Sequence, residues 1–152
     1  KDSIIVSAYE TGLPVFVPAI SDSSIGIGLM LARRAGKSLP LDVIKDVDEI
    51  TSMVEKSKST GVVYIGGGVP KNFIQQTEVA LSLLGSKARG HDYAIQFTTD
   101  PPHYGGLSGC TFDEAVSWGK VSTRAKKVQV YVDATIALPI VSHALAEKSK
   151  KM

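Results

Sequence analysis

The stretch from Gly61 to Lys71, GVVYIGGGVPK, most narrowly limits the folds open to this 152-residue chain. Residues 62–65 read as a fully buried strand, three glycines follow it, and Pro70 suits the first turn of a helix expected over residues 72–84. A strand, a glycine turn and a helix can aim backbone N–H groups at a phosphate. The glycines could equally serve only to let the helix pack closely on a sheet, because their spacing is not G-x-G-x-x-G. Both interpretations stay open.

Strand and helix patterns alternate along the rest of the chain. The apolar runs 3–8 and 13–17 read as short strands, and further strands are expected over 93–99 and 128–132. Helices are expected over residues 25–34, 41–58 and 136–148. The first of these should be buried, and the last should carry Pro139 in its first turn. Such alternation predicts a single α/β domain over residues 1–152, with a doubly wound, Rossmann-like, mostly parallel sheet and helices on both faces.

Composition excludes several classes of protein. Hydrophobic residues make up 43% and charged residues 21%, which is typical of a globular domain, and a net charge of +2 gives no indication of nucleic-acid binding. No apolar run is long enough to span a bilayer, no secretory signal opens the chain, and Cys110 is the single cysteine, so a cytoplasmic location is expected. The three histidines show no metal-ligand spacing, and no metal is predicted.

Residues 111–120, TFDEAVSWGK, predict a short helix followed by a lysine in a distinctive setting. Thr111 and Glu114 form a Thr-x-x-Glu capping box, and Gly119 ends the helix. Lys120 then lies close to Trp118 with acids nearby, and apolar contact favours the uncharged amine that can attack an imine carbon. Most lysines at such positions are merely solvated, so the local pattern alone does not decide between the two interpretations.

Three aspartates, Asp22, Asp100 and Asp133, lie at predicted strand ends or in the turns after them. Parallel strands end at one edge of a sheet, where acids can accept hydrogen bonds from the ribose hydroxyls of a dinucleotide. Taken singly, each aspartate is more often a helix cap or turn former than a ligand-binding residue. The loop at 100–106 also contains His103, which could contact a substrate there.

Residues 114–120, EAVSWGK, resemble the active-site signature of the deoxyhypusine synthase family. Three more stretches resemble the same family in the same order: 14–19 leading to Ser21 and Asp22, 61–71, and 130–134 followed by Pro139. The four matches cover nearly the whole chain. All of them lie in the C-terminal half of such proteins, so the N-terminal half is expected to be missing here.

The resemblance implies an NAD-dependent transferase in which Lys120 forms an imine with the aminobutyl part of a spermidine-like polyamine. The acceptor amine is then a lysine of a translation-factor precursor or, in related enzymes, a small diamine, and the enzyme is a homo-oligomer, a tetramer. The residues that match cofactor positions of the family are Asp22, Gly67, Thr99, Asp133 and Ala134. Asp100 is also expected to bind the cofactor, although the family usually has alanine at this position. The expected amine-site residues are Glu114, Trp118, Asn72, His103, Gly105 and Gly106.

Departures from the family pattern affect the amine site. Ile27 replaces an aspartate, Asn72 replaces a histidine, and Gly105-Gly106-Leu107 replaces Gly-Ser-Asp. Binding a polyamine requires carboxylates that neutralise each ammonium as it is desolvated. We therefore expect a retained mechanism with a different or less charged amine, and little activity without the missing half. Three alternatives remain: a homospermidine synthase-like enzyme with a small diamine acceptor, a catalytically weak cofactor-binding subunit, and a plain NAD-dependent dehydrogenase.

Overall fold

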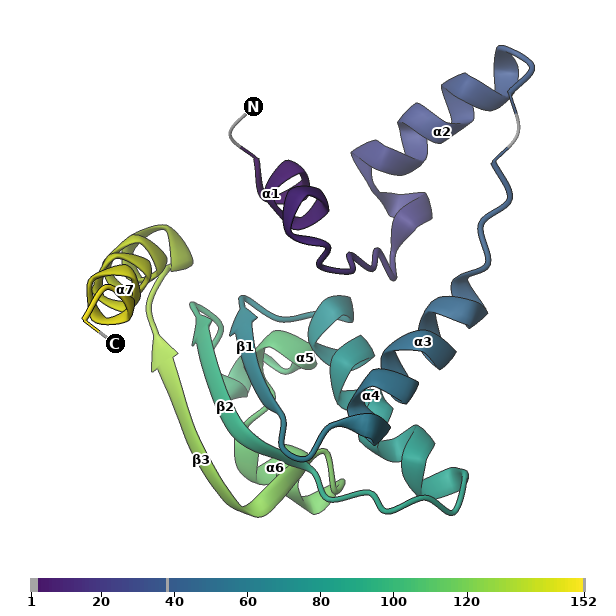
Figure 1. Ribbon diagram of the computed structural model, residues 1–152. Coiled ribbons are helices and arrows are strands. Elements are labelled where there is room, and N and C mark those ends of the chain that lie inside the picture. Colours follow the sequence, from purple (N-terminus) through teal and green to yellow (C-terminus); the bar gives the residue numbers. More distant parts are fainter. Residues whose placement is uncertain (1–2, 38, 152) are drawn as a thin grey trace. The chain divides into compact units, whose positions relative to one another are not determined.

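The structure is a computed structural model that describes residues 3–37 and 39–151. The chain divides into two compact units, residues 1–46 and 47–152 (Figure 1). The first unit contains helix α1 (Ile4–Thr11), the 3₁₀ helix η1 (Ile20–Asp22), helix α2 (Ser24–Arg34) and the start of α3 (Val43–Lys56). The second unit contains the rest of α3 and every strand of the described chain.

The strands expected over residues 3–8 and 13–17 are wrong. Ser3 caps α1 by accepting a hydrogen bond from Val6 N at 3.2 Å, and Gly12 ends it in the left-handed conformation at φ 68°. These two helix signals outweigh the branched apolar residues between them, because an isolated run of that kind has no neighbouring strand to pair with. Residues 13–17 have no regular secondary structure. The helix expected over 25–34 is present as α2, but none of its residues is buried.

The second unit is built on three parallel strands, β1 (Gly61–Ile65), β2 (His91–Thr98) and β3 (Val121–Tyr131), in the order β1-β2-β3. Helix α4 (Val69–Leu83) connects β1 to β2. The 3₁₀ helix η2 (Pro102–Tyr104) and helices α5 (Gly106–Gly109) and α6 (Phe112–Ser117) connect β2 to β3, and α7 (Ala134–Ser149) follows. Figure 1 shows the three arrowheads at the same end of the sheet. The predicted Rossmann-like α/β class is confirmed.

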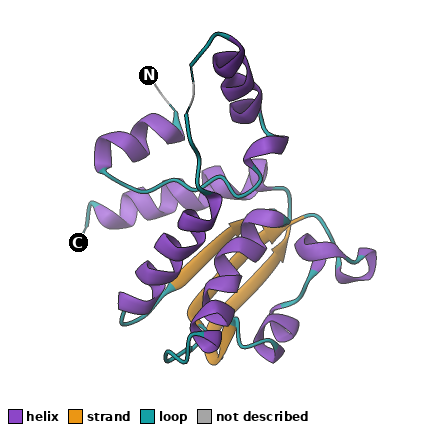
Figure 2. Ribbon diagram, turned by 90° about the vertical axis from the view of Figure 1, so that its right-hand side faces the viewer, coloured by secondary structure: helices purple, strands orange, loops and turns teal. Residues whose placement is uncertain are grey.

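The core of this unit lies on one face of the sheet (Figure 2). Val62, Tyr64 and Ala94 from the strands pack with Phe112 and Ala115 of α6. The prediction of a fully buried first strand is wrong, because β1 buries only alternate residues. The opposite face carries the in-register row Val63, Ile95 and Val128, which are 61%, 36% and 50% exposed.

The last strand and helix are longer than expected. β3 begins at Val121, which pairs with His91, and a register shift follows before Lys126 pairs with Tyr93. The helix α7 begins at Ala134, so Pro139 lies inside it and not in its first turn. Among the residues that the structure describes, no helix has both the length and the apolar character that a bilayer span requires.

The buried imidazole of His91 makes stability dependent on pH. His91 is 1% exposed, with Nδ1 2.9 Å from Thr60 Oγ1, and burial lowers its pKa below the ordinary 6.5. The unfolded chain therefore binds a proton that the native chain does not, so stability should fall as the pH falls below about 6.5. Urea unfolding across this range should show a smaller fall for His91→Gln than for wild type. His103→Gln, which changes an exposed histidine, is the control and should follow wild type. Parallel wild-type and His91→Gln profiles would contradict the assignment.

Candidate functional site

An open crevice of about 420 Å³ lies where β1 and β2 end and β3 leads into α7. Five of the six residues expected to bind cofactor line this single crevice: Gly67, Thr99, Asp100, Asp133 and Ala134. The sixth, Asp22, is an exposed residue of η1 in the first unit. These five residues come from three segments, and each segment is more than thirty positions away from the next along the sequence.

The glycine loop between β1 and α4 forms one wall of the crevice. Gly66 N donates to Phe97 O at 2.7 Å, and Gly68, at φ 74°, is the N-cap of α4. A Cβ atom on Gly67 would overlap the Cα and Cβ atoms of Ser108, so α5 and the loop approach as closely as a glycine allows. The close approach at Gly67 is to α5, so it is not the predicted packing of the following helix on the sheet, and phosphate binding by this loop stays a prediction.

Two carboxylates stand on the other walls. Asp133 caps α7, with Oδ1 accepting from Thr135 N at 2.8 Å and from Thr135 Oγ1 at 2.6 Å. These hydrogen bonds lower the pKa of Asp133 below its ordinary 3.8, so the group is ionised at neutral pH. Asp100 accepts from Ser108 Oγ at 2.5 Å. The cap interpretation of Asp133 is thus correct, and a carboxylate has lone pairs left for a further donor.

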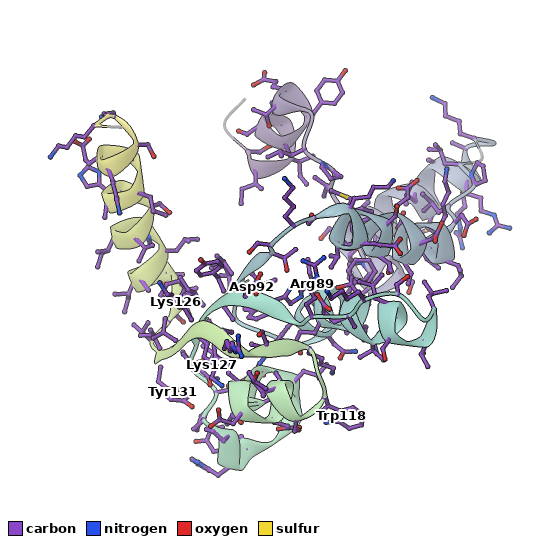
Figure 3. The ribbon with its side chains drawn as sticks, turned by 60° about the horizontal axis from the view of Figure 1, so that its bottom comes forward. Arg89, Asp92, Trp118, Lys126, Lys127 and Tyr131 are labelled. Atoms are coloured by element: carbon purple, nitrogen blue, oxygen red, sulfur yellow. The ribbon has the colours of Figure 1, made fainter. Side chains whose placement is uncertain are left out.

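The backbone of Lys120 lies at the amino end of the strands, and its side chain reaches toward the first turn of α4. Its carbonyl accepts from His91 N at 3.2 Å, at the amino end of β2. Its Nζ lies 5.7 Å from the centroid of the Trp118 ring and donates to Asn72 Oδ1 at 3.3 Å. The predicted lysine–indole pair is therefore present, with Asn72 as a third member. Trp118 is 67% exposed and projects outward beyond α6 (Figure 3).

Comparison with known proteins identifies the family. The sequence model of deoxyhypusine synthase matches residues 1–145. This chain belongs to the deoxyhypusine synthase family. "Probable deoxyhypusine synthase 2" of Methanosarcina acetivorans is 73% identical over 149 residues, covering 98% of this chain and 43% of the relative. "Probable deoxyhypusine synthase 2" of Archaeoglobus fulgidus is 61% identical over 145 residues, 95% of this chain and 48% of the relative.

A third relative, the "Deoxyhypusine synthase-like protein" of Elusimicrobium minutum, is 44% identical over 157 residues, covering 99% of this chain and 42% of the relative. The chain therefore spans less than half the length of the relatives described here.

Sequence reasoning missed the role of Lys71 in this deoxyhypusine synthase-family chain. Lys71 is 2% exposed, and its Nζ donates to Gln96 Oε1 at 2.9 Å and to Cys110 O at 2.8 Å. The rings of Tyr64 and Phe112 lie 5.7 and 6.0 Å from the same nitrogen. Burial lowers the pKa of Lys71, opposed by the nearby acidic groups. A lysine in a first helical turn carries no local sign of burial, because these partners are far away in sequence.

The expected amine-site residues divide into two groups in the structure. Asn72 and Trp118 contact Lys120. Glu114 is exposed on α6, where its backbone N donates to Thr111 Oγ1 at 3.2 Å.

Cys110 lies just before α6, and its environment raises the pKa of its thiol. The larger cause is burial, and the second is a hydrogen bond with the Glu114 carboxylate. A raised pKa argues against a nucleophilic cysteine.

The second group lies apart from the Lys120 cluster, which consists of Lys120, Trp118 and Asn72. His103 is an exposed residue of η2 that stacks edge-on against Tyr104, and Gly105 and Gly106 are exposed. Within the described part of the chain, Lys120 Nζ instead has Asn72 and Trp118 as its partners. Within the same described part of the chain, no three His, Cys, Asp or Glu side chains are grouped so that they could hold a metal ion.

Substitution of Gly67 tests the close approach that shapes the crevice. Gly67→Ala should lower the free energy of unfolding by about 2 kcal/mol, because the added methyl group collides with the Ser108 backbone. Gly28→Ala is the matched control. No atom lies within 4 Å of a Cβ at Gly28, which is inside α2, so the change should be neutral or stabilise by up to about 1 kcal/mol. Urea denaturation measures both variants, and equal stability of the two would show that Gly67 is not constrained.

Proposed function

We propose that this chain carries the reacting lysine and the dinucleotide-binding part of an enzyme that transfers an aminobutyl group from a spermidine-like polyamine to an acceptor amine. Family membership supports the reaction class. The observation that supports the site is the position of Lys120 Nζ beside Asn72, because the helix that carries Asn72 begins at the glycine loop of the crevice. One helix turn therefore connects the lysine to the proposed cofactor site.

The residues that line the crevice support a role in NAD binding. Asp133 and Asp100 would accept hydrogen bonds from ribose hydroxyls, and the loop at residues 66–68 would lie against the pyrophosphate. Thr99 and Ala134 also line the crevice. When bound, a nicotinamide dinucleotide supplies a hydride acceptor for the carbon beside a polyamine nitrogen and a hydride donor for the final reduction.

Lys120 performs the transfer. Its uncharged amine attacks the carbon of the C=N bond in the oxidised polyamine, the bond from that carbon to the smaller diamine breaks, and the diamine leaves with a proton. Lys120 then holds the aminobutyl group as an imine until the acceptor amine attacks the same carbon and releases the lysine. Asn72 orients Nζ by accepting its hydrogen bond, and Trp118 offers an indole face to a cationic amine. The exposed Glu114 carboxylate would pair with a substrate ammonium.

The identity of the amine is a narrower proposal. Ile27, Asn72 and Leu107 stand where the family pattern has groups that bind a polyamine, which favours a different or less charged amine in this chain. This chain is 73% identical to the "Probable deoxyhypusine synthase 2" of Methanosarcina acetivorans but only 44% identical to the "Probable deoxyhypusine synthase 1" of the same organism. This difference supports the placement of this chain in a subgroup with a different amine.

The assembly and the acceptor follow the family expectation. The acceptor is a translation-factor lysine, and the protein works as a cytoplasmic homotetramer. The names of the relatives do not favour a homospermidine-forming enzyme or a catalytically weak subunit. Residues corresponding to the rest of a relative's length would supply the remaining contacts to cofactor and amine.

Trapping the proposed imine tests the function directly. The chain is incubated with NAD and candidate polyamines, with and without the unmatched segment of the Methanosarcina acetivorans relative, and then reduced with borohydride. Mass spectrometry of peptides should find an aminobutyl adduct on Lys120, no adduct in Lys120→Ala, and a wild-type yield in Lys126→Ala, which changes an exposed lysine. Failure to find an adduct with any amine in either mixture would end the covalent proposal.

An isotope experiment separates group transfer from a plain dehydrogenase. A polyamine carrying deuterium at the oxidised carbon should pass the label to the cofactor and receive it back in the transferred aminobutyl group. The physical reason is that the same bound cofactor serves both half-reactions before it leaves. Label that accumulates in released NADH and never returns to the product would identify a simple dehydrogenase.

A further inference from the structure

A buried polar network runs between the crevice and the Lys120 cluster. At its centre is Gln96, in β2, whose side chain is 0% exposed. Gln96 Nε2 donates to Gly66 O at 2.7 Å and to Ser108 O at 3.0 Å, and both of these residues line the crevice. Gln96 Oε1 accepts from Lys71 Nζ at 2.9 Å and from Gln129 Nε2 at 3.1 Å. Every hydrogen-bonding position of this amide is therefore used.

Lys71 extends the network toward Lys120. Its second hydrogen bond is to Cys110 O, just before α6, the helix that leads to Trp118 and Lys120. Lys71 lies in the first turn of α4, next to Asn72, whose Oδ1 accepts from Lys120 Nζ at 3.3 Å. Lys71 thus fixes both the turn that carries Asn72 and the start of the segment that carries Lys120.

The physical cost of this arrangement indicates that it constrains the site. An amine at 2% exposure loses most of its hydration, and its two hydrogen-bond partners are neutral carbonyl oxygens. Removing either Lys71 or Gln96 leaves the other with unpaired buried groups. A buried network whose central amide is fully paired favours one geometry, so the elements that it connects are held in one arrangement.

We propose that Lys71 and Gln96 are a pair of positioning residues that set the geometry of the crevice and of Lys120 together. Gln96 holds the two crevice walls through Gly66 and Ser108. Lys71 holds the α4 turn and the approach to α6 that present Lys120. The inference rests on the proposed function, because it places the cofactor in this crevice and the reacting amine on Lys120.

Three substitutions separate the branches of the network. Gln96→Glu keeps the acceptor for Lys71 but loses both donors to the crevice carbonyls. Asn72→Ala removes only the contact with Lys120. Lys71→Met keeps the length of the side chain but removes every hydrogen bond from Nζ. Lys126→Met, the same change at an exposed lysine on β3 (Figure 3), is the matched control. Circular dichroism checks that each full chain is folded, and Lys71→Gln replaces Lys71→Met if the latter unfolds.

Two readouts are measured on each folded variant. Calorimetric titration gives the dissociation constant for NAD. Reductive alkylation with butanal gives the reactivity of Lys120 without any cofactor: the amine adds to the aldehyde carbon, water leaves, and cyanoborohydride reduces the C=N bond. Peptide mass spectrometry compares Lys120 with Lys148 of α7 in the same sample, so this exposed lysine serves as an internal reference.

The proposal predicts a distinct result for each variant. Gln96→Glu should weaken NAD binding by at least about tenfold and leave Lys120 alkylation at the wild-type rate, because only the crevice branch is broken. Asn72→Ala should change Lys120 alkylation by a similar factor and leave NAD binding intact. Lys71→Met should change both, and Lys126→Met neither.

The outcomes distinguish failure of this inference from failure of the proposed function. If Lys71→Met is folded and keeps both wild-type values, the positioning role is overturned, even though the function can stand. If the wild-type chain binds no NAD, the proposed function fails in this chain, and the pair is then judged on Lys120 alkylation alone. An unchanged alkylation rate in Lys71→Met overturns the inference in that case as well. A lower melting temperature with both readouts unchanged identifies a purely structural pair.

Discussion

The hydrogen bond from Lys71 Nζ to Gln96 Oε1 joins a helix to the middle strand of the sheet inside the protein, at 2.9 Å and away from water. A buried amine tolerates such a position only where its donors are satisfied, so the surrounding backbone must present carbonyl oxygens in fixed places. Gln96 and the Cys110 carbonyl meet this requirement. This constraint ties together α4, the loop before α6 and, through Gln96 Nε2, the glycine turn.

The constraint offers a way for two ends of a parallel sheet to serve the proposed reaction. The crevice lies at the carboxyl ends of the strands, which is where open α/β sheets bind ligands. The backbone of Lys120 lies instead at the amino end of β3. A long side chain and the helix α4 connect the two, because α4 starts at the crevice and its first turn meets Lys120 Nζ. The geometry of the proposed reaction thus depends on the helix as much as on the strand ends.

Local signals in the sequence predicted the fold of the second unit well. The strand, glycine turn and helix at 61–84 are present, and Thr111 caps α6 as its spacing with Glu114 indicates. The residues of this unit that are predicted to bind cofactor meet in one crevice because parallel strands share an edge. Each of these features depends on residues a few positions apart or on a general property of sheets, and sequence reasoning has access to both.

The features that were missed depend on distant partners or on competing local signals. Branched residues at 4–6 suggested a strand, but the Ser3 cap and Gly12 made a helix. The burial of Lys71 depends on Gln96, 25 residues away, and on Cys110, 39 residues away. No periodicity in the first helical turn could reveal that pairing. The early start of β3 likewise depends on the pairing of Val121 with His91. The basic residues between Val121 and Val128 interrupt the apolar pattern, so the sequence did not indicate a strand there.

A crystal structure of the chain after incubation with NAD and a reactive polyamine, followed by borohydride reduction, would test the central claim most directly. The proposed function predicts continuous electron density from Lys120 Nζ to an aminobutyl chain beside Trp118. It also predicts a dinucleotide in the crevice, with its ribose hydroxyls at Asp133 or Asp100 and its pyrophosphate at the loop of residues 66–68. An unmodified Lys120, or a dinucleotide bound elsewhere on the protein, would contradict it.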